Sequence, residues 1–323
     1  MIARRTALAL LSGGLLLASK VAAQSRSPRR LGVLSSSGMR IVDQLREGLR
    51  RVGLIEGRDI EIVYRVTEGG LDGIGQLAAE LVAQKVDVIV ASATPSIQAA
   101  MKATRTVPIV MMTAGDALGS GLVQSLARPG GNVTGLSLML IELAGKLVEL
   151  LVESAPALDR VACLVHAADP LHRGFMGSAE RAAAQLKVGF HPAIVRRDDE
   201  LPDAFADMAA AGTKAVVVQP IFVLTRENSA RIANLAMRHR MAAATGLKRF
   251  AAEGGMLAYA AEFPDMGYRA ARFVDLILRG ANPAELPVER PTEFTLSVNL
   301  KTSAAIGLTI APRIVARADE VIE

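Results

Sequence analysis

The stretch VDVIVASATPSIQAAMKATRTVPIV, residues 86–110, contains a complete strand–helix–strand unit. Its apolar runs at 86–92 and 108–112 are short and rich in Val and Ile, which is typical of strands buried on both faces of a parallel sheet. Pro95 fits the first turn of the helix between them, where its missing N–H has no cost. Ser92 and Thr94 then lie between the end of the predicted strand and the start of the predicted helix. Their hydroxyls allow three interpretations: they act as nucleophiles, they cap the helix, or they form part of an anion-binding site.

The same unit recurs along the chain. Apolar runs alternate with amphipathic stretches, such as the helical stripe of Ile41, Leu45, Leu49 and Val52. This alternation predicts two doubly wound α/β lobes. Strands are expected at 31–36, 60–65, 86–92, 108–112 and 132–138 in the first half, and at 160–166, 191–196, 215–219, 241–245 and 256–260 in the second; helices of the second half are expected near 173–187, 200–211, 225–239 and 264–279.

Ligands of such sheets bind beyond the carboxyl ends of the strands. The residues that follow the predicted strands are small hydroxyls, an amide, carboxylates and a histidine, and one tyrosine lies in the last of these strands. They suit the orientation of a polar small molecule better than acid–base chemistry. The candidate ligand-binding residues are Ser36, Ser37, Ser92, Thr94, Asp116, His166, Asp169, Gln219, Thr245 and Tyr259.

The sequence offers little support for catalysis or for a cofactor. It has no G-x-S-x-G elbow, and His166, Asp169 and Ser178 are more simply explained by local hydrogen bonds than as a catalytic triad. It has no H-E-x-x-H motif and no Cys/His pair at metal-ligand spacing. The segment GIGQLA (73–78) lacks the tight strand–glycine–helix turn of a dinucleotide site, and Asp72 is expected to cap a helix. We therefore expect no enzymatic activity, no metal and no cofactor.

The N-terminus has the layout of a secretory signal peptide. Two arginines precede an apolar run of about 13 residues, too short to span a membrane, and small residues end near position 23. Cleavage there would remove Arg4, Arg5 and Lys20 and lower the formal charge from +5 to +2, which disfavours nucleic acid as a partner. We expect a periplasmic protein with a flexible segment at 24–30. The single cysteine, Cys163, allows no intramolecular disulfide and is expected to be buried.

Several long segments resemble one family. GDALGSGLVQSLARPGGNVTGLS (115–137), together with 145–166, 253–280 and 278–323, is similar to ABC transporter substrate-binding proteins of the tryptophan/tyrosine-binding type. The resemblance implies a type I periplasmic-binding-protein fold, with ligand between two lobes joined by three crossovers. Lobe one would be mainly 31–139 and lobe two mainly 140–245 with 256–286, the remainder of 246–323 being shared between them. The crossovers are expected near Met112–Ala114, Thr245–Leu247 and Pro287–Pro291.

The resemblance also implies a function. The expected protein is a monomeric, extracytoplasmic solute-binding component of an ABC importer, which binds an amino acid or a related carboxylate and docks on a membrane permease. Ser92, Thr94 and the amides of the following helix would hold the carboxylate, and Asp116 the ammonium. Ser36, Gln219, Asp169 and Tyr259 would close over the other end. A second interpretation is an exported sensor that presents its ligand to a membrane receptor. Gly115-Asp116-Ala117 stands where the family has Gly-Asp-Pro, and tyrosines are few.

Overall fold

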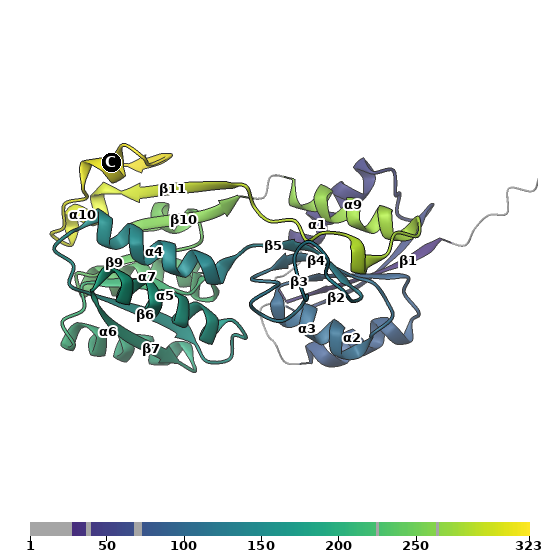
Figure 1. Cartoon of the computed structure of the whole chain (residues 1–323), viewed down its shortest axis with the longest axis horizontal. Coiled ribbons are helices and arrows are strands. Elements are labelled where there is room, and N and C mark those ends of the chain that lie inside the picture. Colours follow the sequence, from purple (N-terminus) through teal and green to yellow (C-terminus); the bar gives the residue numbers. More distant parts are fainter. Residues whose placement is uncertain (1–27, 37–39, 68–72, 224–225, 263–264) are drawn as a thin grey trace, which may run out of the picture.

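The computed structural model describes residues 28–36, 40–67, 73–223, 226–262 and 265–323. Two α/β lobes lie side by side along the long axis of the molecule, as Figure 1 shows. The fold class predicted from the strand–helix alternation is confirmed. Within the described residues, none of the helices combines the length and the apolar composition needed to cross a membrane.

Lobe one is built on a five-stranded sheet in the order β2-β1-β3-β4-β5, with every pair parallel. Apolar side chains of α1 and α9 cover one face, and those of α2 and α3 cover the other. Parallel strands buried on both faces account for the near-continuous Val/Ile runs. The strands are β1 (Arg29–Ser35), β2 (Ile60–Val66), β3 (Val88–Ser92), β4 (Ile109–Ala114) and β5 (Val133–Ser137), and the helices are α1 (Arg40–Arg51), α2 (Ile74–Ala83), α3 (Thr94–Ala103) and α9 (Met266–Leu278).

Lobe two has a seven-stranded sheet in the order β12-β11-β10-β9-β8-β6-β7. Only the β10–β11 pairing among its described strands is antiparallel. Its strands are β6 (Arg160–His166), β7 (Gly189–Val195), β8 (Ala215–Val218), β9 (Ala242–Thr245), β10 (Leu257–Glu262), β11 (Glu293–Asn299) and β12 (Glu320–Ile322), and its helices are α4 (Leu140–Ser154), α5 (His172–Leu186), α6 (Leu201–Ala210), α7 (Arg226–Arg238), α8 (Arg249–Ala252), α10 (Leu300–Ala305) and α11 (Pro312–Val315). Three short 3-10 turns complete the described elements: η1 (Asp198–Glu200), η2 (Pro220–Val223) and η3 (Pro283–Glu285).

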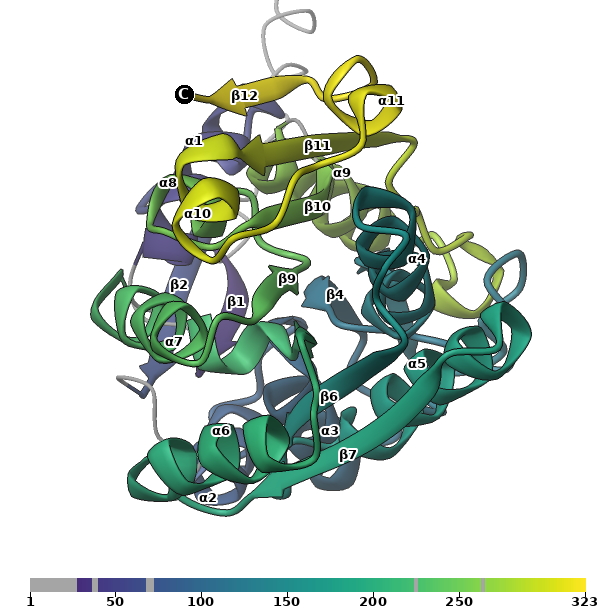
Figure 2. The ribbon, with the colours of Figure 1, turned by 90° about the vertical axis from the view of Figure 1, so that its left-hand side faces the viewer.

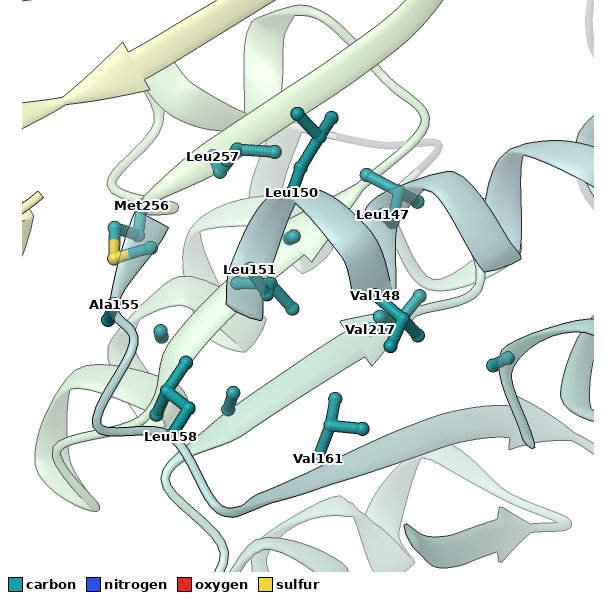
Figure 3. Close-up of a cluster of buried hydrophobic side chains, with 14 of the residues drawn as sticks. Leu147, Val148, Leu150, Leu151, Ala155, Leu158, Val161, Val217, Met256 and Leu257 are labelled. Carbon is teal, nitrogen blue, oxygen red and sulfur yellow. The ribbon is translucent and has the colours of Figure 1, made fainter. Parts of the chain in front are cut away.

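The larger core of lobe two lies between its sheet and helices α4 and α5 (Figure 2). Leu147, Val148, Leu150 and Leu151 of α4 lie in this core together with Val217 of β8 and Leu257 of β10, as Figure 3 shows. A second core forms on the other face, under α6 and α7. Cys163 lies in the first of these cores and is fully buried, as predicted for a strand thiol.

Two of the predicted crossovers are wrong. Residues 112–114 belong to β4 and stay within lobe one, and Thr245 ends β9 inside the sheet of lobe two. The chain leaves lobe one after β5 and enters α4 at Leu140, in agreement with the boundary expected between residues 139 and 140, and it returns to lobe one between β10 and α9. It passes to lobe two for the last time between Glu289, which still pairs with Leu136 of lobe one, and β11.

The assignment of 256–286 to lobe two is wrong for helix α9. Ala270, Ala271 and Val274 of this helix pack with α1 and with strands β3 and β4 of lobe one. Figure 1 shows α9 beside α1. The physical reason is that the apolar face of α9 fits the open face of the lobe-one sheet, a match that no local pattern in the sequence reveals.

The expectation of a flexible segment at 24–30 also needs correction. Arg29 and Arg30 belong to β1 and pair with β2. Arg29 forms an ion pair with Asp87, and Arg30 forms one with Glu61. The backbone N–H of Arg30 also donates to the Asp87 carboxylate at 2.7 Å. The predicted signal peptide (1–23) and Asp72 lie outside the described residues.

Candidate ligand-binding site

The carboxyl ends of the two sheets face each other at the junction of the lobes (Figure 1). Gly115 follows β4 of lobe one, and Leu171 follows β6 of lobe two. The Leu171 side chain lies against the α-carbon of Gly115, so that a Cβ at this position would collide with it. Residues at the two strand-end edges therefore meet across the junction.

Ser92 and Thr94 form part of a hydrogen-bonded group at the lobe-one edge. The Ser92 hydroxyl shares a 2.8 Å hydrogen bond with the Thr113 hydroxyl, which also accepts from the Ala93 N–H at 2.8 Å. Thr94 Oγ1 accepts from the Gly115 N–H at 3.0 Å. These bonds tie the end of β3 to the end of β4. Neither hydroxyl caps α3, which argues against the interpretation as helix caps. The hydrogen-bond partners of both hydroxyls are uncharged groups and include no base, which argues against the nucleophile interpretation.

The backbone between these two hydroxyls is strained. Ala93 has φ of 71° and ψ of 146°, a region that residues with a Cβ rarely adopt. Ala93 immediately precedes α3, whose first turn contains Pro95 as predicted. The amides that begin a helix have no partner within it. The strained turn thus directs the start of α3 towards the same edge as the hydroxyls.

Ser36 joins this group from β1. Its hydroxyl accepts from the Ser96 hydroxyl at 3.2 Å, so the end of β1 is linked to the first turn of α3. Ser37 lies outside the described residues. Ser96 and Thr113 were missed by sequence reasoning, although both stand within two residues of a predicted strand end or helix start, which was an available signal.

Asp116 caps the turn that follows β4. Its Oδ1 accepts from the Gly119 N–H at 2.7 Å, and its side chain is largely buried. The neighbouring Ala117 N–H donates to Ser137 Oγ at 3.0 Å. One oxygen of the carboxylate therefore has a structural partner at the lobe-one edge.

Gln219 occupies the middle of the lobe-two edge. Its Oε1 accepts from the His166 N–H at 2.9 Å, whereas its Nε2 has no hydrogen-bond partner among the described residues. The side chain is 1% exposed, and buried amide donors are nearly always paired. The His166 ring accepts from the Ala168 N–H at 3.2 Å and lies 5.8 Å from the Phe222 ring.

Asp169 organises the loop between β6 and α5. Its Oδ1 accepts from the Leu171 N–H at 2.8 Å, and its carbonyl oxygen accepts from the His172 ring at 2.7 Å. Burial raises the pKa of the Asp169 carboxyl above its usual value because it disfavours the charged form. The hydrogen bond from the Leu171 amide and the nearby His166 and His172 rings partly oppose this rise.

A raised pKa makes the stability of lobe two depend on pH. The buried carboxyl is most favourable when protonated, so its contribution is fully present below the unfolded-state pKa and is lost as the pH rises through the folded-state pKa. Asp169→Asn keeps an oxygen for the Leu171 amide and cannot ionise. Relative to the unmodified protein, the variant should therefore be more stable at pH 7 than at pH 4, that is, its free energy of unfolding should be relatively larger at pH 7, as measured by urea denaturation. Asp207→Asn, on the exposed face of α6, is the control; an equal Asp169→Asn difference at both pH values would contradict the prediction.

Thr245 and Tyr259 make contacts within lobe two. The Thr245 hydroxyl is fully buried and donates to the Val218 carbonyl at 2.8 Å. The Tyr259 ring stacks on the Phe294 ring, with 5.5 Å between centroids and 10° between planes, and packs against the core under α4. The structure thus gives both side chains partners inside the lobe, and it places Thr245 beside Val218, the residue that precedes Gln219.

Two apolar residues at the junction were missed by sequence reasoning. Leu171 and Leu140 both approach the α-carbon of Gly115, next to Thr94. The N–H of Leu140 donates to the Gly115 carbonyl at 2.8 Å. Nothing in the sequence marked these leucines, because an apolar residue beside a predicted strand or helix is the common case.

Two α/β lobes with polar strand ends turned towards each other define the architecture of a solute-binding protein. Residues 33–322 match the sequence model of the family described as ABC transporter substrate binding protein, and the chain belongs to that family. The resemblance seen in the sequence is therefore confirmed. The family is one of solute-binding proteins rather than of enzymes.

Relatives of known name or structure agree with this assignment. The tyrosine-binding protein of Clostridioides difficile (strain R20291) is 23% identical over 288 residues, which cover 88% of this chain and 82% of the relative. A conserved domain protein of Vibrio cholerae has a TM-score of 0.81 at 24% identity, over 91% of this chain and 100% of its own. An ABC domain from Streptococcus pneumonia, solved in complex with L-Trp, has a TM-score of 0.80 at 24% identity, over 92% and 100%. At these identities the two structures establish the shared fold.

Proposed function

We propose that this protein is the extracytoplasmic solute-binding component of an ABC importer, and that it binds an amino acid or a related carboxylate between its lobes. The observation that carries the proposal is the placement of hydrogen-bonding side chains at both facing strand-end edges. Ser92 and Thr94 lie on one edge, and Gln219 and Asp169 lie on the other. A ligand between these edges would contact both lobes at once.

Lobe one supplies the pole for a carboxylate. Thr94 Oγ1 already accepts from the Gly115 amide, so its own O–H is the group that remains to donate. The start of α3 adds the positive end of a helix dipole, which stabilises an anion by about 0.3–1 kcal/mol, or up to about 2 kcal/mol when partly buried. Hydrogen bonds to a charged group contribute about 1.5–3 kcal/mol each. Two or three such bonds together with apolar burial reach the roughly 8 kcal/mol of a micromolar complex.

Lobe two supplies the groups that would make closure depend on the ligand. The Gln219 Nε2 donor lacks a partner among the described residues, and a ligand acceptor would satisfy it. The Asp169 carboxylate of lobe two uses one oxygen for a backbone amide, as the Asp116 carboxylate of lobe one does, and in each the second oxygen would accept from a ligand ammonium. Only a ligand that touches both lobes shifts the balance between open and closed forms.

The relatives support an amino acid as the ligand class. One is named for tyrosine, and another was solved with L-Trp. Both ligands share the α-carboxylate and α-ammonium groups for which the two poles are suited. The closed, loaded form would then be the one that docks on a membrane permease.

A thermal-shift screen of the chain without residues 1–23 tests the proposal. L-Tyrosine, L-tryptophan, L-leucine, purines and small carboxylates without an amine are compared. We expect at least one amino acid to raise the melting temperature, since a ligand at 100 times its Kd adds about 2.7 kcal/mol to the stability. The chain contains no tryptophan, so binding of L-tryptophan can be followed separately by the fluorescence of the ligand. If no amino acid in the screen stabilised the protein, the carboxylate–ammonium assignment would be wrong.

A further inference from the structure

Two aliphatic side chains at the lobe junction pack against the backbone of glycines. Leu171 of lobe two lies against the α-carbon of Gly115 in lobe one. Ile141, in the first turn of α4, approaches the α-carbons of Gly119 in lobe one and of Gly174 in α5. A Cβ at any of these three glycines would be closer to the leucine or isoleucine than real Cβ atoms come. We call this set, Leu171 and Ile141 with their three glycines, the pivot contact.

The pivot contact lies beside the first crossing between the lobes. The Leu138 N–H donates to the Ala114 carbonyl and the Leu140 N–H to the Gly115 carbonyl, both at 2.8 Å. These bonds attach the crossing segment to the end of β4. Any rotation of one lobe about this crossing starts next to Gly115, and a small change in separation there becomes a larger change at the rim.

The lobe-two side of the contact is held in place. The Asp169 carboxylate accepts from the Leu171 N–H, and the Asp169 carbonyl accepts from the His172 ring, so the backbone of this loop has fixed partners. Leu171 is 6% exposed, and Leu140 approaches the same point on Gly115. The leucine side chain therefore has limited room to move away from a larger residue at position 115.

We propose that the pivot contact sets the angle between the lobes. The Leu171 side chain packs against Gly115, and this steric contact limits how closely the two lobes approach. Gly115 directly follows β4, and Leu171 directly precedes α5 in the loop after β6. Added volume at position 115 pushes the lobes apart, and volume removed at position 171 lets them approach. The proposal deepens the proposed function, because the angle determines how readily a ligand reaches both poles.

The test measures the distance between the lobes in ligand-free protein. Cysteines introduced at the exposed Gln76 of α2 and Asp207 of α6 carry spin labels, and the native Cys163 is fully buried and stays unlabelled. Pulsed electron paramagnetic resonance then gives the distance distribution. We expect Gly115→Ala to shift the distribution to longer distances and Leu171→Ala to shift it to shorter ones. The double variant should return close to the starting distribution.

Gly75→Ala is the matched control, because a Cβ at this helical glycine meets nothing within 4 Å. Its distribution should not change. A folded Gly115→Ala protein with an unchanged distribution would overturn the proposal, and so would a shift that persists when Leu171→Ala is added. Adding L-tyrosine or L-tryptophan to the labelled protein is a separate arm. If neither shortened the distance, the proposed function would lose support, and the pivot contact would still be decided by the ligand-free measurements.

Discussion

Gly267→Ala is expected to lower the free energy of unfolding by about 3 kcal/mol, at the upper end of the usual cost of overpacking. Gly267 lies in the first turn of α9, and a Cβ there would overlap the backbone carbonyl of Gln44 in α1. Gly48 of α1 is in the reciprocal position, with its α-carbon against the Gly267 carbonyl. Backbone atoms cannot rotate out of the way as a side chain can. The two helices must separate, and the apolar face that α9 covers on the lobe-one sheet becomes exposed.

Urea denaturation followed by circular dichroism measures this loss. Gly75→Ala is again a suitable control, since Gly75 is exposed near the start of α2 and has open space around its α-carbon. It should leave the stability unchanged or raise it by up to about 1 kcal/mol, because alanine is the better helix former. If both variants had the same stability, α9 would not pack against α1 through these glycines.

Thr94→Val is expected to weaken the binding of the stabilising amino acid by about 10- to 150-fold. Valine keeps the shape of threonine and removes the hydroxyl, which we propose donates to the ligand carboxylate. The loss of one hydrogen bond to a charged group costs about 1.5–3 kcal/mol, which converts to that range of Kd. The bond from the Gly115 N–H is lost as well, so a decrease in stability of about 1 kcal/mol should accompany the change. Isothermal titration calorimetry on folded protein separates the two effects.

Thr213→Val provides the matched control for this substitution. Thr213 is 3% exposed, as Thr94 is, and its hydroxyl is buried without a hydrogen-bond partner among the described residues. It precedes β8 at the amino end of the strand, away from the proposed ligand poles. The control should bind the same amino acid with unchanged affinity. Equal affinities for Thr94→Val and Thr213→Val would remove Thr94 from the proposed site.

The sequence was most informative where one local rule decides the structure. Strand β6 was predicted with its observed bounds, since RVACLVH is a continuous apolar run whose termini are marked by charged and polar residues. Strand β11 (EFTLSVN) was missed because it alternates polar and apolar residues near the end of the chain, where its antiparallel partner β10 is far away in sequence. The lobe to which α9 belongs depends on long-range packing, which has no local signature.

The candidate site shows the same division. Strand-end hydroxyls such as Ser36, Ser92 and Thr94 could be selected because parallel strands align their carboxyl ends, and the structure brings these three together at one edge. Thr245 satisfied the same rule but uses its hydroxyl to bond the neighbouring strand. Leu171 could not be found at all, since its position depends on how the two lobes meet.

The placement of α9 also determines the order in which the chain can complete its lobes during synthesis. The sheet of lobe one is finished at Ser137, yet one of its apolar faces is covered only by α1 until residues 266–278 have been made. Lobe two in turn lacks β11 and β12 until the last residues emerge. Contacts between such distant segments form slowly. A nascent chain of this topology therefore remains incompletely folded until it is almost whole.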